Sequence, residues 1–216
     1  TTATDANGVF AVDEWAKRQN MALCHKQNIV TCSSRLLAGK EVVFSSPWEI
    51  KGTPPANIML TQNGQAQVVV SVFRQPENVL HLVPRIVVLG VGCRRGVSTE
   101  QFSEQMDLFF NKTGLCVKSL CAVASIDIKK DEPALTEFCS RNSLPLLTYS
   151  AQELAAVEGT FSASEFVQKT VGVENVCERA ACLGAKGTIL LSKQASGGVT
   201  VAAAQKEFTP DWSWTD

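Results

Sequence analysis

Beyond residue 85, short apolar runs alternate with longer segments whose apolar residues recur at helical spacing. This pattern predicts strands over 85–91, 120–125 and 144–149, with helices over 98–112 and 133–142. Strands that alternate with helices favour a largely parallel sheet, because each helix carries the chain back to start the next strand in the same direction. We therefore expect a layered α/β domain over residues 85–216.

Polar residues three positions apart mark where helices begin in this part of the chain. The spacing of a capping box is found at Ser98 with Gln101, Ser150 with Glu153, Ser162 with Glu165 and Asn175 with Glu178. Pro133 suits the first position of a helix. Further helices are expected over 151–157, 164–170 and 176–183, followed by a closing strand pair over 188–191 and 199–203 around Gly197 and Gly198.

The first part of the chain has a less regular pattern and predicts a small α/β unit. We expect a helix over 7–23, a helical turn over 33–38 that Gly39 ends, and short strands over 41–44, 57–60 and 67–73. Residues 74–84 contain two prolines and mixed polarity, as linkers do. The predicted domains are therefore 1–84, linker included, and 85–216, and the tail 206–216 is expected to be a docked or frayed end.

Charge and cysteine usage narrow the class of protein. Twenty Lys and Arg residues against 21 Asp and Glu residues give a formal net charge of −1, so no overall basic field attracts nucleic acid or an anionic membrane. The longest apolar stretches, 68–73 and 86–91, have the length of strands, so no membrane-spanning segment is expected. The eight cysteines never form C-x-x-C spacing, which favours reduced thiols in a cytoplasmic protein over a disulfide framework.

A glycine-rich segment, Gly90–Gly96, lies between a predicted strand and a predicted helix. Glycines let backbone amides approach a ligand closely, and the start of a helix carries partial positive charge. The third glycine is one residue too late for a dinucleotide fingerprint, and Arg94 and Arg95 fill the gap. The segment therefore predicts a site for a carboxylate or a phosphate, with a solvated arginine pair as the alternative.

A second segment, 124–133, follows the next predicted strand and holds two lysines beside two acids, at Lys129, Lys130, Asp131 and Glu132. Because ligand crevices form outside the carboxyl ends of parallel strands, we expect this segment and the segment with Arg94 and Arg95 at the same edge of the sheet. Such a group can supply a general base and an electrostatic clamp. The alternative is that the acids begin a helix and that the lysines face solvent.

Other candidate residues carry weaker signals. Lys169 and Thr170 stand near a predicted helix end, and Cys93 beside Arg94 is either a thiol of lowered pKa or an inert buried one. His25 and His81 are expected at the surface rather than as ligands, and no metal site is predicted. Serine hydrolase chemistry is disfavoured because the sequence has no G-x-S-x-G motif.

These segments, in this order, resemble the cobalamin-biosynthesis family CbiG. The resemblance rests on TTATD…FAVDEWA at 1–16, GVGCRRG at 90–96, ASIDIKKDEPAL at 124–135, PLLTYSAQEL at 145–154, SEFVQKTVGVENVCERAA at 164–181 and GGVTVA at 197–202. It implies the middle region of that family over 1–84 and a C-terminal domain of the CbiG/CobE type over 85–216. It also implies a missing N-terminal domain, in keeping with a chain that begins at Thr1 without an initiator Met or a secretory signal.

The resemblance implies a cobalt-precorrin-5A hydrolase of vitamin B12 synthesis, which opens the δ-lactone of a tetrapyrrole and releases acetaldehyde to give cobalt-precorrin-5B. Cobalt is then carried by the substrate, so no protein-bound cofactor is expected. On this interpretation Arg94 and Arg95 bind carboxylates or an oxyanion, and Asp131 or Glu132 is the base. The remaining substrate-binding candidates are Gly90, Gly92, Cys93, Asp127, Lys129, Lys130, Lys169 and Thr170.

Two other functions stay open at this point. One is a noncatalytic corrinoid-binding or carrier module of the CobE type, against which the middle region 1–73 argues because it accompanies the hydrolase arrangement. The other is a nucleotide-phosphate binder, which rests on the glycine loop alone. The sequence leaves the oligomeric state open.

Overall fold

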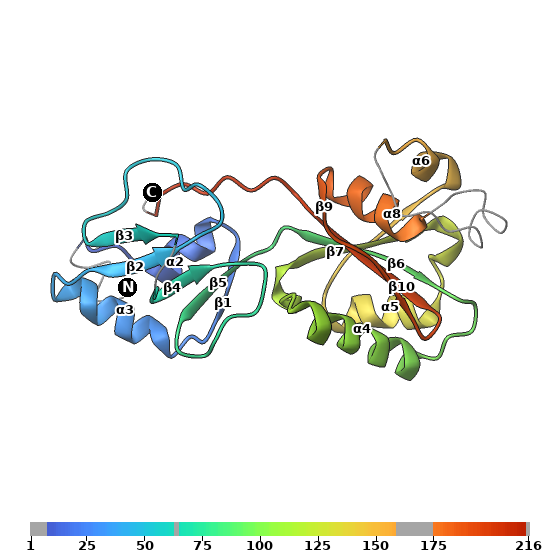
Figure 1. The fold of residues 1–216 in the computed structure, drawn as a ribbon, viewed down its shortest axis with the longest axis horizontal. Coiled ribbons are helices and arrows are strands. Elements are labelled where there is room, and N and C mark those ends of the chain that lie inside the picture. Colours follow the sequence, from blue (N-terminus) through green and yellow to red (C-terminus); the bar gives the residue numbers. More distant parts are fainter. Residues whose placement is uncertain (1–7, 63–64, 159–174, 215–216) are drawn as a thin grey trace. The chain divides into compact units, whose positions relative to one another are not determined.

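The computed structural model describes residues 8–62, 65–158 and 175–214 of the chain. It divides the chain into two compact units, one of Thr1–Arg85 together with Phe208–Asp216, and one of Ile86–Glu207. Each unit is built on one five-stranded, mostly parallel sheet, so the predicted α/β class is confirmed (Figure 1).

The sheet of the first unit has the strand order β1-β5-β4-β2-β3. Its strands are β1 (Met21–Cys24), β2 (Val42–Ser45), β3 (Ile58–Thr61), β4 (Val68–Val70) and β5 (Leu80–Pro84), and only β1 runs antiparallel to its neighbour. Helices α2 (Val12–Arg18) and α3 (Asn28–Leu37) complete it. The three strands expected over 41–73 are confirmed, and the helical turn expected over 33–38 extends back to Asn28 and ends before Gly39, whose φ is +67°.

The tail of the chain is part of the core of the first unit. Trp212 stacks on Trp15 with ring centroids 5.1 Å apart, and Phe10 and Phe44 pack against both rings. The Trp15 indole N–H donates a hydrogen bond of 2.6 Å to the carbonyl oxygen of Asp211. Of the two outcomes expected for the tail, the structure has the docked one, because the aromatic side chains bury a large apolar area.

Two predictions for the first unit are wrong. The segment 74–84 is not a linker throughout, because all five residues of β5 are buried between β1 and β4. The helix expected over 7–23 ends at Arg18, and β1 follows it from Met21. Strand β1 pairs with β5 over Met21–Pro84 to Cys24–His81, and β5 also pairs with β4 on its other side. Local periodicity does not report this pairing between distant segments.

The expectation that His81 lies at the surface is also wrong. Only 1 % of this residue is exposed, and its Nε2 lies 2.9 Å from the carbonyl oxygen of Ser71. This hydrogen bond offsets the cost of burying a polar ring. The buried imidazole therefore belongs to the interior of the sheet, where it interrupts an otherwise apolar strand.

The sheet of the second unit has the strand order β8-β7-β6-β10-β9. Strands β6 (Val87–Cys93), β7 (Leu120–Ile126) and β8 (Leu146–Tyr149) are parallel, and β9 (Thr188–Ser196) and β10 (Val199–Gln205) form the closing antiparallel pair. One face is covered by α8 (Val176–Ala185) with α6 (Ala151–Ala155), and the other by α4 (Thr99–Thr113) and α5 (Pro133–Arg141) (Figure 1). These elements confirm the alternation expected from the sequence.

The expected helix starts are confirmed where the structure describes them. Ser150 and Glu153 form a complete capping box. The side chains of Ser98 and Asn175 accept hydrogen bonds from the backbone N–H groups of Gln101 and Glu178, respectively. Pro133 is the first residue of α5. The Ser162 and Glu165 pair and the helix expected over 164–170 lie outside the described residues.

A buried carboxylate joins the start of α8 to the edge strand β9. Only 2 % of Glu178 is exposed; its Oε1 accepts a 2.6 Å hydrogen bond from the backbone N–H of Lys193, and its Oε2 one of 2.5 Å from the Asn175 amide. Lys193 lies where the pairing of β9 with β10 shifts register between Val201 and Ala203, and the carboxylate satisfies its amide there.

Replacing Glu178 by Ala is therefore expected to destabilise the protein by about 1–3 kcal/mol, because it leaves the partly buried N–H of Lys193 without its acceptor. The melting temperature should fall by roughly 2–4 °C for each kcal/mol. Thermal unfolding followed by circular dichroism measures the change. Glu137→Ala is the control, since Glu137 forms a solvent-exposed ion pair with Arg141, and such pairs contribute little. Equal melting temperatures for the two variants would contradict this role for Glu178.

Candidate functional site at the carboxyl ends of the parallel strands

Two loops with charged side chains leave the same edge of the second sheet. Strands β6 and β7 are parallel neighbours, with Gly90 opposite Ala124, so their carboxyl ends reach the same side. The loop 94–98, here called the arginine loop, follows β6, and the short helix η2 (Asp127–Lys129) follows β7. Helices α4 and α5 begin directly after these loops, and their N-termini add partial positive charge to this edge.

Gly90 and Gly92 have a different role from the one expected. Both belong to β6 itself, and the loop begins only at Arg94. A Cβ atom on Gly90 would lie 1.7 Å from the carbonyl oxygen of Cys177 in α8, and one on Gly92 would lie 2.7 Å from Oγ1 of Thr200 in β10. The missing side chains therefore let α8 and β10 approach the strand closely.

The arginine loop and the β9–β10 turn form the walls of a pocket of about 510 Å³ that is open to solvent. It is lined by Arg94, Arg95, Gly96, Val97, Gln101, Gly197 and Gly198. The turn is fixed to the loop by a 2.8 Å hydrogen bond from the backbone N–H of Arg94 to the carbonyl oxygen of Gly198. The Gln101 side chain donates a second one of 3.0 Å to Gly197.

The charge of this pocket comes from two exposed guanidinium groups. Neither the Arg94 nor the Arg95 side chain forms a hydrogen bond or an ion pair with any of the residues that the structure describes. A guanidinium carries five N–H donors in a planar fork that matches a carboxylate or a phosphate. The pocket is therefore suited to an anionic group.

A second cluster lies beside the pocket, where β6 and β7 end. The Lys129 ammonium lies 2.7 Å from Oε2 of Glu132, and only 14 % and 12 % of these side chains are exposed. The Cys93 thiol is the third member: burial raises its pKa, which the adjacent Lys129 partly opposes. A raised pKa favours the protonated thiol at neutral pH, which is the inert of the two alternatives for Cys93.

The remaining candidate residues do not join this cluster. Asp127, Lys130 and Asp131 are exposed to solvent. Lys169 and Thr170 lie outside the described residues. Sequence reasoning missed Gln101 as a lining residue, because its spacing from Ser98 suggested a capping role, and it treated Gly197 and Gly198 only as a turn.

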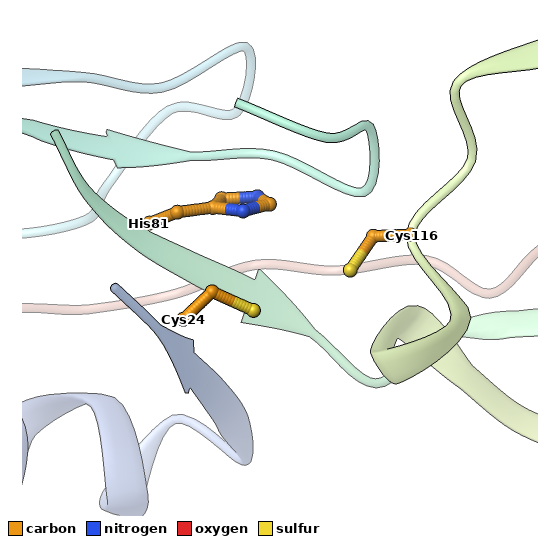
Figure 2. Close-up of side chains that lie close together, drawn as sticks. All are labelled: Cys24, His81 and Cys116. Carbon is orange, nitrogen blue, oxygen red and sulfur yellow. The ribbon is translucent and has the colours of Figure 1, made fainter. Parts of the chain in front are cut away.

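In the first unit, a thiol and an imidazole lie side by side on neighbouring strands. Cys24 of β1 and His81 of β5 are direct cross-strand partners, and their ligand atoms lie within 4.8 Å of each other (Figure 2). Cys116, which Figure 2 also labels, belongs to the second unit. A pair of donors is fewer than the three or four protein ligands that zinc uses, so the pair by itself defines no metal centre.

The second unit is thus an α/β domain with a pocket lined by two arginines at the carboxyl ends of its parallel strands. Residues 87–204 match the family described as cobalamin synthesis G C-terminus. This match covers more than half of the chain, and the chain belongs to this family. The family is one of cobalamin biosynthesis, as the resemblance led us to expect.

Curated relatives and a solved structure agree with this assignment. The chain is 28 % identical to the cobalt-precorrin-5A hydrolase of Priestia megaterium, over 94 % of this chain and 60 % of that protein. It is 31 % identical to the cobalt-precorrin-5A hydrolase of Salmonella typhimurium, over 93 % of this chain and 62 % of that protein. The crystal structure of CobE, a protein from the cobalamin (vitamin B12) biosynthetic pathway, superposes on 58 % of this chain and 93 % of its own, with a TM-score of 0.52 and 26 % identity.

The chain therefore spans about three fifths of the length of these hydrolases. None of the helices in the described parts of the chain is both long enough and apolar enough to cross a membrane.

Proposed function

We propose that this chain acts in the hydrolysis of cobalt-precorrin-5A, in which the δ-lactone is opened and the bridging carbon leaves as acetaldehyde. The observation that carries the proposal is the open pocket at the carboxyl ends of parallel strands, whose two guanidinium groups have no partner among the residues that the structure describes. Two relatives matched over more than nine tenths of this chain bear the name of that hydrolase, which supports the same reaction.

The chemistry of such a substrate suits this pocket. A tetrapyrrole with acetate and propionate arms presents several carboxylates, and each can accept paired hydrogen bonds from a guanidinium group. The protein as a whole has a formal net charge of −1, so attraction for these arms has to be local. Arg94 and Arg95 would hold carboxylates, and the exposed Lys130 would hold another arm.

Lactone opening requires an activated water and stabilisation of the oxyanion that forms at the carbonyl carbon. The acids at positions 131 and 132 are the candidates for the base. Cobalt belongs to the substrate and can accept electron density through the macrocycle when the carbon–carbon bond breaks. The proposal therefore requires no cobalt ligand from the protein.

The proposal is tested by incubating the protein with cobalt-precorrin-5A and measuring acetaldehyde. One arm uses this chain alone, and another uses a fusion with the part of the Priestia megaterium relative that this chain does not match. We expect release from the fusion and slower release from the chain alone, because a large ligand is commonly held between domains. Corrinoid binding without acetaldehyde in both arms would contradict the hydrolase and favour a noncatalytic binding module of the CobE type.

A further inference from the structure

Lys129 and Glu132 differ from their charged neighbours in being shielded from water. Their side chains are only 14 % and 12 % exposed, whereas those of Lys130 and Asp131, which lie between them in the sequence, project into solvent. Taking two charges out of water costs free energy, and the mutual attraction in such pairs often does no more than offset that cost. An apolar pair would stabilise the fold about equally well. Stability alone therefore does not explain why these two positions are charged.

The Glu132 side chain pairs with Lys129 instead of capping the helix that follows. Glu132 is the N-cap residue of α5, yet its side chain makes no capping hydrogen bond and turns to Lys129 instead. Lys129 is the last residue of η2, directly beyond the carboxyl end of β7, and it also acts on the Cys93 thiol at the end of β6. The pair is therefore placed where the two parallel strands end, next to the arginine loop.

The two side chains offer complementary chemistry at one point. A carboxylate has two oxygens, and Glu132 uses Oε2 for Lys129, so Oε1 can accept a proton from a water molecule. An ammonium has three N–H donors, and the structure directs one of them at Glu132. A further donor can serve an oxygen atom that becomes negative during a reaction.

We propose that Glu132 and Lys129 act as one unit in lactone opening, Glu132 as the general base and Lys129 as the donor to the oxyanion. This inference rests on the proposed function, and it gives Lys129 a different role from that of gripping a substrate arm. It also excludes Asp131 as the base, because that carboxylate is exposed and is not held by the pair.

The atoms of the step balance without an oxidant or a reductant. Glu132 takes a proton from water while the water oxygen forms a bond to the lactone carbonyl carbon. The carbonyl electrons move onto oxygen, where the Lys129 ammonium donates a hydrogen bond. When the tetrahedral intermediate collapses, the bond to the ring oxygen breaks, and Glu132 returns its proton to that oxygen. The products are a carboxylic acid and a free hydroxyl group, which together contain the lactone and one water.

The chain provides a matched control for each member of the pair. Glu132→Gln is compared with Glu137→Gln, and Lys129→Met with Lys112→Met. Each comparison removes the same type of charge from a position outside the site. Turnover is measured as acetaldehyde released from cobalt-precorrin-5A by the active form of the protein, with kcat and KM determined separately. The melting temperature of each variant is measured in parallel.

We expect Glu132→Gln to lower kcat by roughly 10²–10⁴-fold and Lys129→Met by roughly 10²–10³-fold, with KM nearly unchanged. The two control variants should keep kcat within a few-fold of the unchanged protein. The double variant Lys129→Met/Glu132→Gln removes both charges and is expected to fold. Its kcat should be about as low as that of Glu132→Gln alone, because residues that act as a unit are not additive.

The possible results separate the role of the Lys129–Glu132 pair from the proposed hydrolase function. If the unchanged protein releases acetaldehyde while Glu132→Gln performs like Glu137→Gln, the pair has no part in catalysis and this inference is overturned while the proposed function stands. If the two losses multiply in the double variant, the residues act independently and the unit is disproved. If the unchanged protein releases no acetaldehyde in any form, the proposed function fails and the inference falls with it.

Discussion

Replacing Gly90 by Ala is expected to destabilise the second unit more than any other single methyl group added to β6. The new Cβ would lie 1.7 Å from the carbonyl oxygen of Cys177 and 2.9 Å from the Cβ of Ala181, so α8 would have to move away from the sheet. Overpacking of a core costs about 1–3 kcal/mol and occasionally more. Backbone obstructs the methyl group here, so we expect a loss of about 3 kcal/mol or more.

A loss of this size is a large part of the 5–15 kcal/mol by which domains are typically stable. The melting temperature should fall by roughly 6–12 °C or more, as measured by circular dichroism. Gly114→Asn is the control in the same unit, because Gly114 has a φ of +70° with open space around its Cα, and Asn tolerates this conformation. A Gly90→Ala protein that melts with the control would show that α8 does not depend on the close approach.

Replacing Arg94 and Arg95 together by Ala is expected to weaken tetrapyrrole binding by roughly a hundredfold or more. Each guanidinium group can form charge-assisted hydrogen bonds to a carboxylate, which contribute about 1.5–3 kcal/mol. Every 1.4 kcal/mol corresponds to about a tenfold change in affinity. The melting temperature should hardly change, because both side chains are exposed and form no ion pair with the described residues.

Affinity is measured by titration with the corrinoid, followed by its absorbance, at two salt concentrations. The loss should be smaller at high salt, since screening already weakens the exposed charges in the unchanged protein. Arg141→Ala is the control: Arg141 is also an exposed arginine, it lies at the far end of α5, and it pairs with Glu137. Unchanged affinity in the double variant would remove the pocket from substrate binding.

Local signals were sufficient for the elements of the second unit. Ser150 with Glu153, and Pro133 at the start of α5, act through hydrogen bonds and dihedral angles within a few residues, so they can be identified in the sequence. The arginine loop was found for the same reason, because glycines and arginines between a strand and a helix are a local pattern. The side chains of Arg94 and Arg95 do line one pocket.

Other features depend on residues that are distant in the sequence. The two prolines and mixed polarity of 74–84 predict a linker, whereas pairing with β1 and β4 makes β5 a buried strand. The pocket needs Gly197 and Gly198, about a hundred residues from Arg94, which the β9–β10 turn brings to the loop. The sequence could not report either contact.

The sequence by itself therefore determined the α/β class, most helix boundaries and the positions of the charged loops, since these follow from periodicity, capping and turn residues. Tertiary structure alone decided which charges are shielded. The sequence shows four consecutive charged residues, Lys129, Lys130, Asp131 and Glu132. Of these, the first and last are largely shielded from solvent and pair with each other, and the two between them are exposed. The physical reason is that burial depends on which strand ends and helix starts pack around a side chain, and this is fixed only when β6 and β7 come together with the start of α5.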